Sequence, residues 1–210
     1  MQYINIKFPE QKVTFPEAVV TGLGKGQGLF FPEDLAPLDN IPALLDMDFV
    51  SRSTLILQYL VGDAMTIDVL QDCVEKAFVF PLPLKPVSEN IHALELFHGP
   101  SLAFKDFGAR FMAQCLGSFN ANQKTTILTA TSGDTGAAVA LAFYGQPGID
   151  VVGLSPTGNV NRICRIQPHC RKNCFVLWVE IFERLPLRMI SMLAKHWSNN
   201  LLMTRNWSEQ

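Results

Sequence analysis

Apolar residues recur at three- and four-residue spacing in two stretches of the first third of the chain. Residues 41–60 and 66–78 both have this spacing, which is typical of amphipathic helices. Residues 15–23 form a shorter segment of the same kind. The sequence FPLPLKPV at residues 80–87 contains three prolines, so we expect an extended segment there. The pattern predicts a small helical region over residues 1–88 that ends at these prolines.

From about residue 93 the pattern changes to short apolar runs that alternate with helical spacing. Predicted strands and helices follow one another in the order strand 94–97, helix 105–116, strand 125–132, helix 134–145 and strand 150–156. Such alternation is typical of a parallel sheet with flanking helices. We therefore expect an α/β region over residues 89–158, with ligands bound at the carboxyl ends of its strands.

Composition and charge narrow the class of protein. The chain has 210 residues, of which 48% are hydrophobic and 17% charged, enough to build a globular core. A net charge of -2 gives no reason to expect nucleic acid or a membrane as partner. Without an eighteen-residue apolar window or a signal-peptide pattern, a cytoplasmic location is expected. Cys73 and Cys115 stand singly on predicted helices, so we expect reduced structural thiols.

A glycine-rich segment near the amino terminus is a first candidate for ligand binding. Residues 22–28, GLGKGQG, hold four glycines in seven positions. Glycines around Lys25 would suit a phosphate, but the Gly-Lys-Ser/Thr ending of a P-loop is missing. A structural turn is the better interpretation.

A second candidate is Lys105 in the sequence HGPSLAFKDF. A lone lysine is usually a solvated charge whose stem lies on apolar surface. Lys105, however, falls in the first turn of a predicted helix, where a cation is unfavourable by about 0.3–1 kcal/mol. An apolar setting at a helix amino end favours the neutral, nucleophilic form of an amine, which is the form that makes a Schiff base with a carbonyl cofactor.

A third candidate is the sequence TATSGDTGAA, which joins a predicted strand to a predicted helix. Its small side chains let backbone N–H groups and hydroxyls converge on an anion at the amino end of the helix, so a carboxylate or phosphate would fit. The alternative is a helix cap, in which Ser132 or Asp134 satisfies free N–H groups.

Together these segments resemble one family. ELFHGPSLAFKDFGARFMAQ followed by ILTATSGDTGAAVA resembles threonine synthase, a pyridoxal-phosphate enzyme of the tryptophan-synthase-β fold type. VTFPEAVVTGLGKGQGLFFPEDLA is similar to the amino-terminal signature of the same family. The resemblance extends over about residues 1–158. It implies an α/β fold, here an incomplete fold-type II enzyme with a helical amino-terminal region and a partial parallel sheet.

The resemblance also implies roles for particular residues. Lys105 would link covalently to pyridoxal 5'-phosphate and later shuttle protons, with Phe104 flanking the cofactor and Asp134 facing its ring. The substrate's α-carboxylate would be received by Ser132, Gly133 and Thr135. The implied reaction converts the small molecule O-phosphohomoserine and water into threonine and phosphate. His98 and Ser101 belong to the same motif, without a specific role.

The segment 159–210 departs from the family and from the rest of the chain. It has no glycine and no aspartate, yet holds all three tryptophans and three of the five cysteines. A zinc site at Cys164, His169, Cys170 and Cys174 lacks the usual paired ligand spacing, so no metal is expected.

A change of reading frame explains this composition. Read two bases out of frame, the codons of residues 171–182 permit EKLFCTLGGNI, which resembles the family's continuation. The pair Trp178-Val179 must then give glycine. We therefore hypothesise that residues 159–210 are a frameshifted tail, and the nucleotide sequence of the gene tests this directly.

This hypothesis changes the expected activity. The resemblance implies that the cofactor's phosphate cup lies in the second half of the family's chain, so an inactive or impaired fragment is expected. Uncovered strand edges would also favour aggregation. The alternatives are a non-catalytic remnant, a fragment that binds small anions at Ser132, or another fold-type II lyase or dehydratase.

Overall fold

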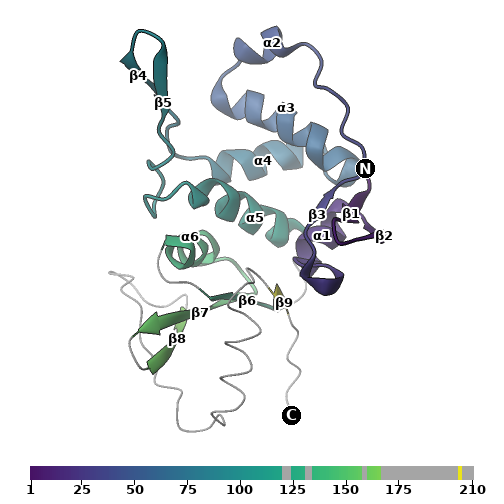
Figure 1. The fold of residues 1–210 in the computed structure, drawn as a ribbon, viewed down its shortest axis with the longest axis vertical. Coiled ribbons are helices and arrows are strands. Elements are labelled where there is room, and N and C mark those ends of the chain that lie inside the picture. The colour runs from purple at the N-terminus through teal and green to yellow at the C-terminus, as the bar shows by residue number, and fades with distance from the viewer. Residues whose placement is uncertain (120–123, 131–133, 158–159, 167–202, 205–210) are drawn as a thin grey trace.

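The computed structural model describes residues 1–119, 124–130, 134–157, 160–166 and 203–204 (Figure 1). Contrary to the helical expectation, the chain begins with a small antiparallel sheet of order β2-β1-β3, formed by β1 (Tyr3–Asn5), β2 (Phe8–Val13) and β3 (Phe30–Pro32). Tyr3 and Asn5 are buried on one side of β1, and the Tyr3 hydroxyl donates to the Leu60 carbonyl at 2.5 Å. That bond ties the sheet to the helices that follow.

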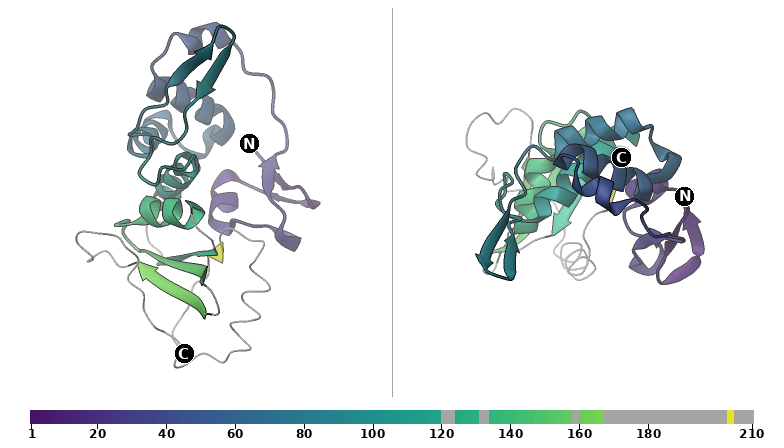
Figure 2. Two further views of the ribbon diagram at one scale, coloured as in Figure 1. Left: turned by 60° about the vertical axis from the view of Figure 1, so that its left-hand side comes forward. Right: turned by 90° about the horizontal axis from the view of Figure 1, so that it is seen from above.

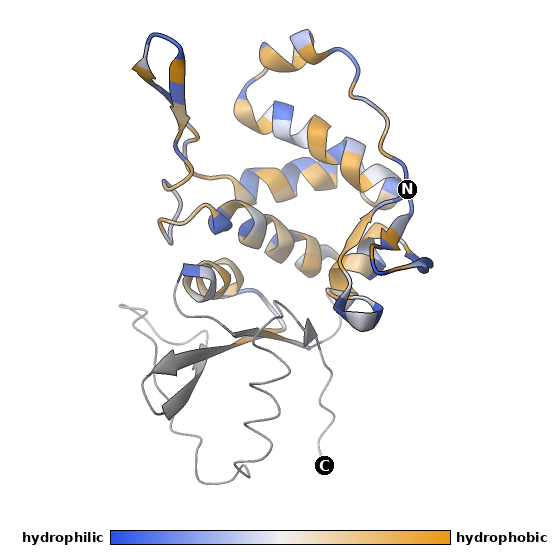
Figure 3. Cartoon of the chain, in the orientation of Figure 1, coloured by the Kyte–Doolittle hydropathy of each residue, from blue (hydrophilic) through white to orange (hydrophobic). Residues whose placement is uncertain are grey.

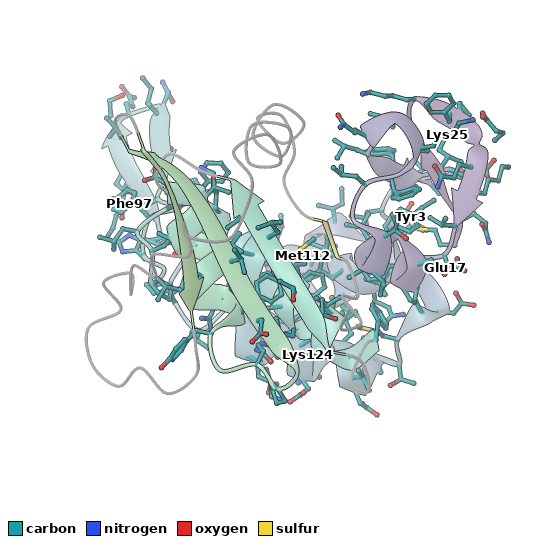
Figure 4. All side chains as sticks on the ribbon, turned by 90° about the horizontal axis from the view of Figure 1, so that it is seen from below. Tyr3, Glu17, Lys25, Phe97, Met112 and Lys124 are labelled. Carbon is teal, nitrogen blue, oxygen red and sulfur yellow. The ribbon has the colours of Figure 1, made fainter. Side chains whose placement is uncertain are left out.

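The glycine-rich segment is a structural turn, as predicted. It includes a short 3₁₀ turn, η1 (Lys25–Gln27), that folds over Asn5. The Asn5 Nδ2 donates to the Gln11 side chain at 2.7 Å and to the Lys25 carbonyl at 2.9 Å. A Cβ on Gly28 would lie 1.8 Å from Asn5 Oδ1, so only glycine fits there. The Lys25 side chain lies over the Phe8 ring, on the outer side of the amino-terminal sheet (Figure 4).

The helices of the first third include those predicted, with one break. Their bounds are α1 (Phe15–Thr21), α2 (Ile41–Leu45), α3 (Phe49–Val61), the 3₁₀ turn η2 (Gly62–Ala64) and α4 (Ile67–Ala77). The single helix expected over residues 41–60 is therefore wrong. Asp48 caps α3, and its Oδ1 accepts the N–H groups of Val50 at 2.9 Å and Ser51 at 3.0 Å. This cap starts a new helix although the apolar spacing continues across it.

A first hydrophobic core lies among α3, α4 and α5 (Lys105–Phe119). Its buried members are Val61, Met65, Leu70, Cys73, Val74 and Cys115. Both thiols are free, which confirms the expected structural role. Burial raises the pKa of Cys115 to about 12, because a thiolate would lose its hydration there.

Between the helical region and the α/β region lies a hairpin of β4 (Leu84–Ser88) and β5 (Ile91–Leu94). The extended segment predicted at residues 80–87 is confirmed in β4, but the strand predicted over residues 94–97 is wrong. The hairpin ladder pairs Leu94 with Leu84, where β4 begins. The Glu95 N–H still donates to the Pro83 carbonyl at 3.0 Å, but Pro83 has no N–H to return a bond, so the ladder goes no further. The hairpin projects from the helices (Figures 1 and 2).

The α/β region follows the predicted order. It contains α5, β6 (Thr125–Ala130), α6 (Asp134–Phe143) and β7 (Ile149–Thr157), and β6 pairs with β7 in parallel. The pairing runs from Thr125↔Ile149 to Ala130↔Leu154. A second core joins α5 and α6 to these strands through Ala113, Leu116, Ile127, Val139, Ala142, Phe143 and Val151. Met112 packs against it from α5 (Figure 4).

Two further strands complete a sheet of order β8-β7-β6-β9. β8 (Val160–Ile166) runs antiparallel along β7, and β9 (Met203–Thr204) meets β6 at two residues. The edges of β6 and β7 are thus paired in this structure, contrary to expectation. Of the zinc candidates, His169, Cys170 and Cys174 lie outside the described residues, as does most of the tail. No helix in the described ranges is long and apolar enough to cross a bilayer.

Candidate functional site

Lys105 is the first residue of α5, as predicted, and its amine has no ionic partner among the described residues. Its Nζ lies 4.5 Å from the centroid of the Phe104 ring, which is itself exposed. Among the described residues, no carboxylate or carbonyl oxygen pairs with this ammonium group. In contrast, Lys12, Lys76 and Lys124 all pair with carboxylates. Within the described part of the chain, no ion pair holds the Lys105 amine.

The turn that precedes Lys105 is built on Asp106, a residue that sequence reasoning missed. Asp106 is fully buried, and its Oδ2 accepts the Ser101 N–H at 2.8 Å. A Cβ on Gly99 would lie 2.3 Å from the same oxygen, so the glycine makes room for the carboxylate. The sequence signal that could have indicated this role is the position of Asp106 in the first turn of a helix, where carboxylates are favoured, seven residues after Gly99.

The backbone of this turn is also strained. Leu102 adopts a positive φ of 59°, a conformation that an apolar residue with a Cβ rarely takes. Its N–H donates to the Gly99 carbonyl at 3.0 Å, which closes the turn. Strained residues of this kind persist where the surrounding structure holds them, often at functional sites.

The other residues of the motif hold the turn in place. His98 Nε2 forms a hydrogen bond with Glu95 at 2.7 Å, and the His98 ring packs beside Phe97. The Ser101 hydroxyl accepts the Ala103 N–H at 3.3 Å. These contacts favour a structural role for His98 and Ser101 over direct chemistry.

The strand-to-helix junction after β6 is the second half of the candidate site. Asp134 begins α6 at an exposed position and Thr135 is half-buried, whereas Ser132 and Gly133 lie outside the described residues. In chain order, the carboxyl end of α5 is followed by the start of β6, and the end of β6 is followed by the amino end of α6. Because α5 and α6 pack together on the sheet, both helices begin toward the carboxyl end of β6 (Figure 1).

Two buried polar atoms in this region lack a hydrogen-bond partner among the described residues. They are Asp106 Oδ1, in the first turn of α5, and Thr129 Oγ1, near the carboxyl end of β6. Buried polar groups are nearly always paired, so such exceptions need an explanation. One explanation is that these two atoms belong to a site whose ligand or covering residues are not in place.

Comparison with known proteins points to one family. Residues 2–78 match the family model described as "Threonine synthase N terminus". The chain is 56% identical over 161 residues to threonine synthase from Haemophilus influenzae, covering 77% of this chain and 38% of that protein. It is 52% identical over 163 residues to the Escherichia coli enzyme, with the same coverage.

Solved structures agree with this likeness. The crystal structure of Escherichia coli threonine synthase matches with a TM-score of 0.71 and 52% identity, over 75% of this chain and 37% of that one. A pyridoxal-phosphate-bound threonine synthase from Brucella melitensis matches with a TM-score of 0.71 and 31% identity, over 76% and 36%. The predicted fold class is thereby confirmed. The chain spans about 38% of the length of its curated relatives.

Proposed function

We propose that this chain, which corresponds over three quarters of its length to the amino-terminal part of threonine synthases, is the lysine-bearing part of such an enzyme. The whole enzyme would convert O-phosphohomoserine and water into threonine and phosphate. The observation that carries the proposal is Lys105, a free amine at the amino end of α5 within the motif of the resemblance.

The described residues fit pyridoxal phosphate in three respects. Lys105 supplies an amine with no ionic partner, and the exposed Phe104 ring beside it offers an apolar surface for a planar cofactor. The amino ends of α5 and α6 favour negative charge, which the cofactor and its substrate both carry. When bound, the cofactor supplies an electron sink for carbanion chemistry.

Each residue then has a defined task. Lys105 would hold the cofactor through its Nζ and carry protons to and from the substrate, while Phe104 would shield one side of the site. Asp134 would face the cofactor ring. The substrate carboxylate would bind at the amino end of α6 through Ser132, Gly133 and Thr135, since N–H groups and hydroxyls at a helix amino end suit an anion.

Activity of this chain by itself is a separate question. It spans about 38% of the length of its relatives, so most of the protein that would surround the cofactor has no counterpart in the matched residues. We propose that the chain alone is inactive or strongly impaired. Complementation of a threonine auxotroph tests this. Growth supported by the chain alone would show that the matched part suffices for catalysis.

Cofactor binding is tested by absorbance. Mixing the purified chain with pyridoxal phosphate should produce a visible band from the lysine adduct, and Lys105→Ala should abolish it. Lys85→Ala is the matched control, because Lys85 is an exposed lysine on β4 outside the site. A band that survives Lys105→Ala, or one that falls equally in both variants, would refute the role of Lys105.

A further inference from the structure

The carboxyl end of α4 is capped by a side chain from α5. The last carbonyls of a helix have no partner within the helix itself. In α4, the Arg110 Nε donates to the Ala77 carbonyl at 2.6 Å, and Nη2 of the same side chain donates to the Lys76 carbonyl at 2.7 Å. The helix dipole also favours a guanidinium group at this end. One side chain therefore joins the two helices through two hydrogen bonds.

An aromatic cluster holds the same two helices together. The ring centroid of Phe107 lies 5.6 Å from that of Phe78 and 4.9 Å from that of Phe80, and both pairs meet edge to face. Phe111 lies 6.3 Å from Phe78. α4 and α5 lie side by side, and both carry apolar residues (Figures 1 and 3). Phe107 is followed by Arg110 and Phe111 three and four residues later, so all three share the side of α5 that faces the end of α4.

Lys105 lies on a different side of α5. It comes four residues before Ala109 and seven before Met112, a spacing that places the three on one side of the helix. Ala109 and Met112 pack against the core that joins α5 to α6 and the sheet. α5 is therefore held between the end of α4 and the sheet core, and Lys105 continues its sheet-facing side at the amino end.

The turn before Lys105 has no comparable attachment to the rest of the protein. Among the described residues, every hydrogen bond made by residues 98–104 stays within residues 95–107. The turn closes on itself and depends on α5 for its position. Arg110 is five residues after Lys105, which is about 7.5 Å along the helix axis. Within the described part of the chain, its hydrogen bonds are the nearest ones that join this end of α5 to another helix.

We propose that Arg110 is a positioning residue for Lys105. By binding two carbonyls of α4, the guanidinium group fixes the direction of the first turns of α5, and with it the position from which the Lys105 amine reaches a carbonyl cofactor. This inference rests on the proposed function. Position matters because a reacting group displaced by about 1 Å can lose much of its rate. A lysine at residue 110 would keep the charge but lack the planar fork that donates to both carbonyls, so it should replace arginine only in part.

The experiment compares the full 210-residue chain with three variants. Arg110→Ala removes both hydrogen bonds, and Arg110→Lys keeps the charge without the fork. Tyr3→Phe is the matched control, because the Tyr3 hydroxyl also donates to a carbonyl in the last turn of a helix, that of Leu60 in α3. Tyr3 contacts Phe15, which contacts Phe119 at the carboxyl end of α5, so the control leaves the amino end of α5 untouched.

Three measurements, made well below the unfolding temperature, separate positioning from stability. Labelling of Lys105 by pyridoxal phosphate and borohydride, divided by that of Lys85, should fall at least about tenfold in Arg110→Ala, by less in Arg110→Lys, and not in Tyr3→Phe. Acetylation by acetic anhydride, which needs only an accessible amine, should give the same ratio in all four proteins. Without cofactor, amide hydrogen exchange in residues 106–111 should be faster in Arg110→Ala than in the wild type and the control.

Several results would overturn the proposal. These are an unchanged pyridoxal-phosphate labelling ratio in Arg110→Ala, an equal fall in Tyr3→Phe, or a parallel fall in acetylation, which would indicate a general loss of structure. Wild-type labelling without preference for Lys105 would instead refute the proposed function. Hydrogen exchange then decides the role of Arg110 by itself. Faster exchange in residues 106–111 of Arg110→Ala alone would support the anchor to α4, and unchanged exchange would overturn it.

Discussion

Two glycine-containing turns in this chain are built in the same way and differ in one respect. In the first, Gly28 packs on buried Asn5, whose Nδ2 donates twice and whose Oδ1 accepts the Lys7 N–H at 2.9 Å. In the second, Gly99 packs on buried Asp106, which accepts one N–H and keeps Oδ1 unpaired. The first turn is complete in itself, whereas the second is open beside a free lysine. Unmet polar groups, rather than glycine content, distinguish the candidate site from a structural loop.

The largest expected effect concerns the closed turn. Gly28→Ala should destabilise the protein by about 3 kcal/mol, because the new methyl group would overlap the side chain of Asn5, which is fully buried. Gly99→Ala should cost less, about 1–2 kcal/mol, since its methyl group would lie 2.3 Å from Asp106 Oδ2, a smaller overlap than the 1.8 Å contact at Gly28. Denaturant unfolding measures both. A larger loss of unfolding free energy in Gly99→Ala than in Gly28→Ala would contradict the view that the first turn is the more tightly closed of the two.

The next prediction distinguishes two roles of Asp106, as a hydrogen-bond acceptor and as a negative charge. Asp106→Ala should destabilise by about 2 kcal/mol, because the Ser101 N–H loses its buried acceptor. Asp106→Asn keeps an acceptor oxygen and should cost under about 1 kcal/mol if the bond to Ser101 is its main role. Thermal unfolding decides between them. Equal losses in the two variants would mean that the buried charge, and not the acceptor, is what the turn requires.

The effect that is smallest at neutral pH lies at Cys115, in the hydrophobic core among α3, α4 and α5. Its pKa is raised from 9.0 to about 12 by burial, so the folded state keeps its proton where the unfolded state has lost it. This contribution to stability is complete below pH 9 and is lost as the pH rises from 9 toward 12. Unfolding measured across that range should show a decline that is smaller in Cys115→Ala. An identical decline in both proteins would contradict it.

The sequence predicted the parts of the fold where local pattern and tertiary structure agree. The elements at α5, β6, α6 and β7 follow their apolar periodicity and lie where expected. The amino-terminal sheet was missed because β1 and β3 have only three residues each, too few for a periodic signal. The break before α3 was missed because apolar spacing runs through it.

The candidate site was predicted in outline. Lys105 and the start of α6 lie at the helix ends where the motifs put them. Asp106 escaped notice because a carboxylate is rarely fully buried, and its role depends on Gly99, which lies next to it only after folding. The exposure of Leu84, Val87, Ile91 and Leu94 in the hairpin was not predicted either, because apolar residues in a short strand usually indicate a buried face.

The central claim is that the open turn presents Lys105 to a carbonyl cofactor. It is tested most directly by incubating the chain with pyridoxal phosphate, reducing the adduct with borohydride and locating the label by peptide mass spectrometry. The account predicts that Lys105 is labelled ahead of every other lysine at limiting cofactor. Labelling of Lys105 no greater than that of the exposed Lys85 would contradict it.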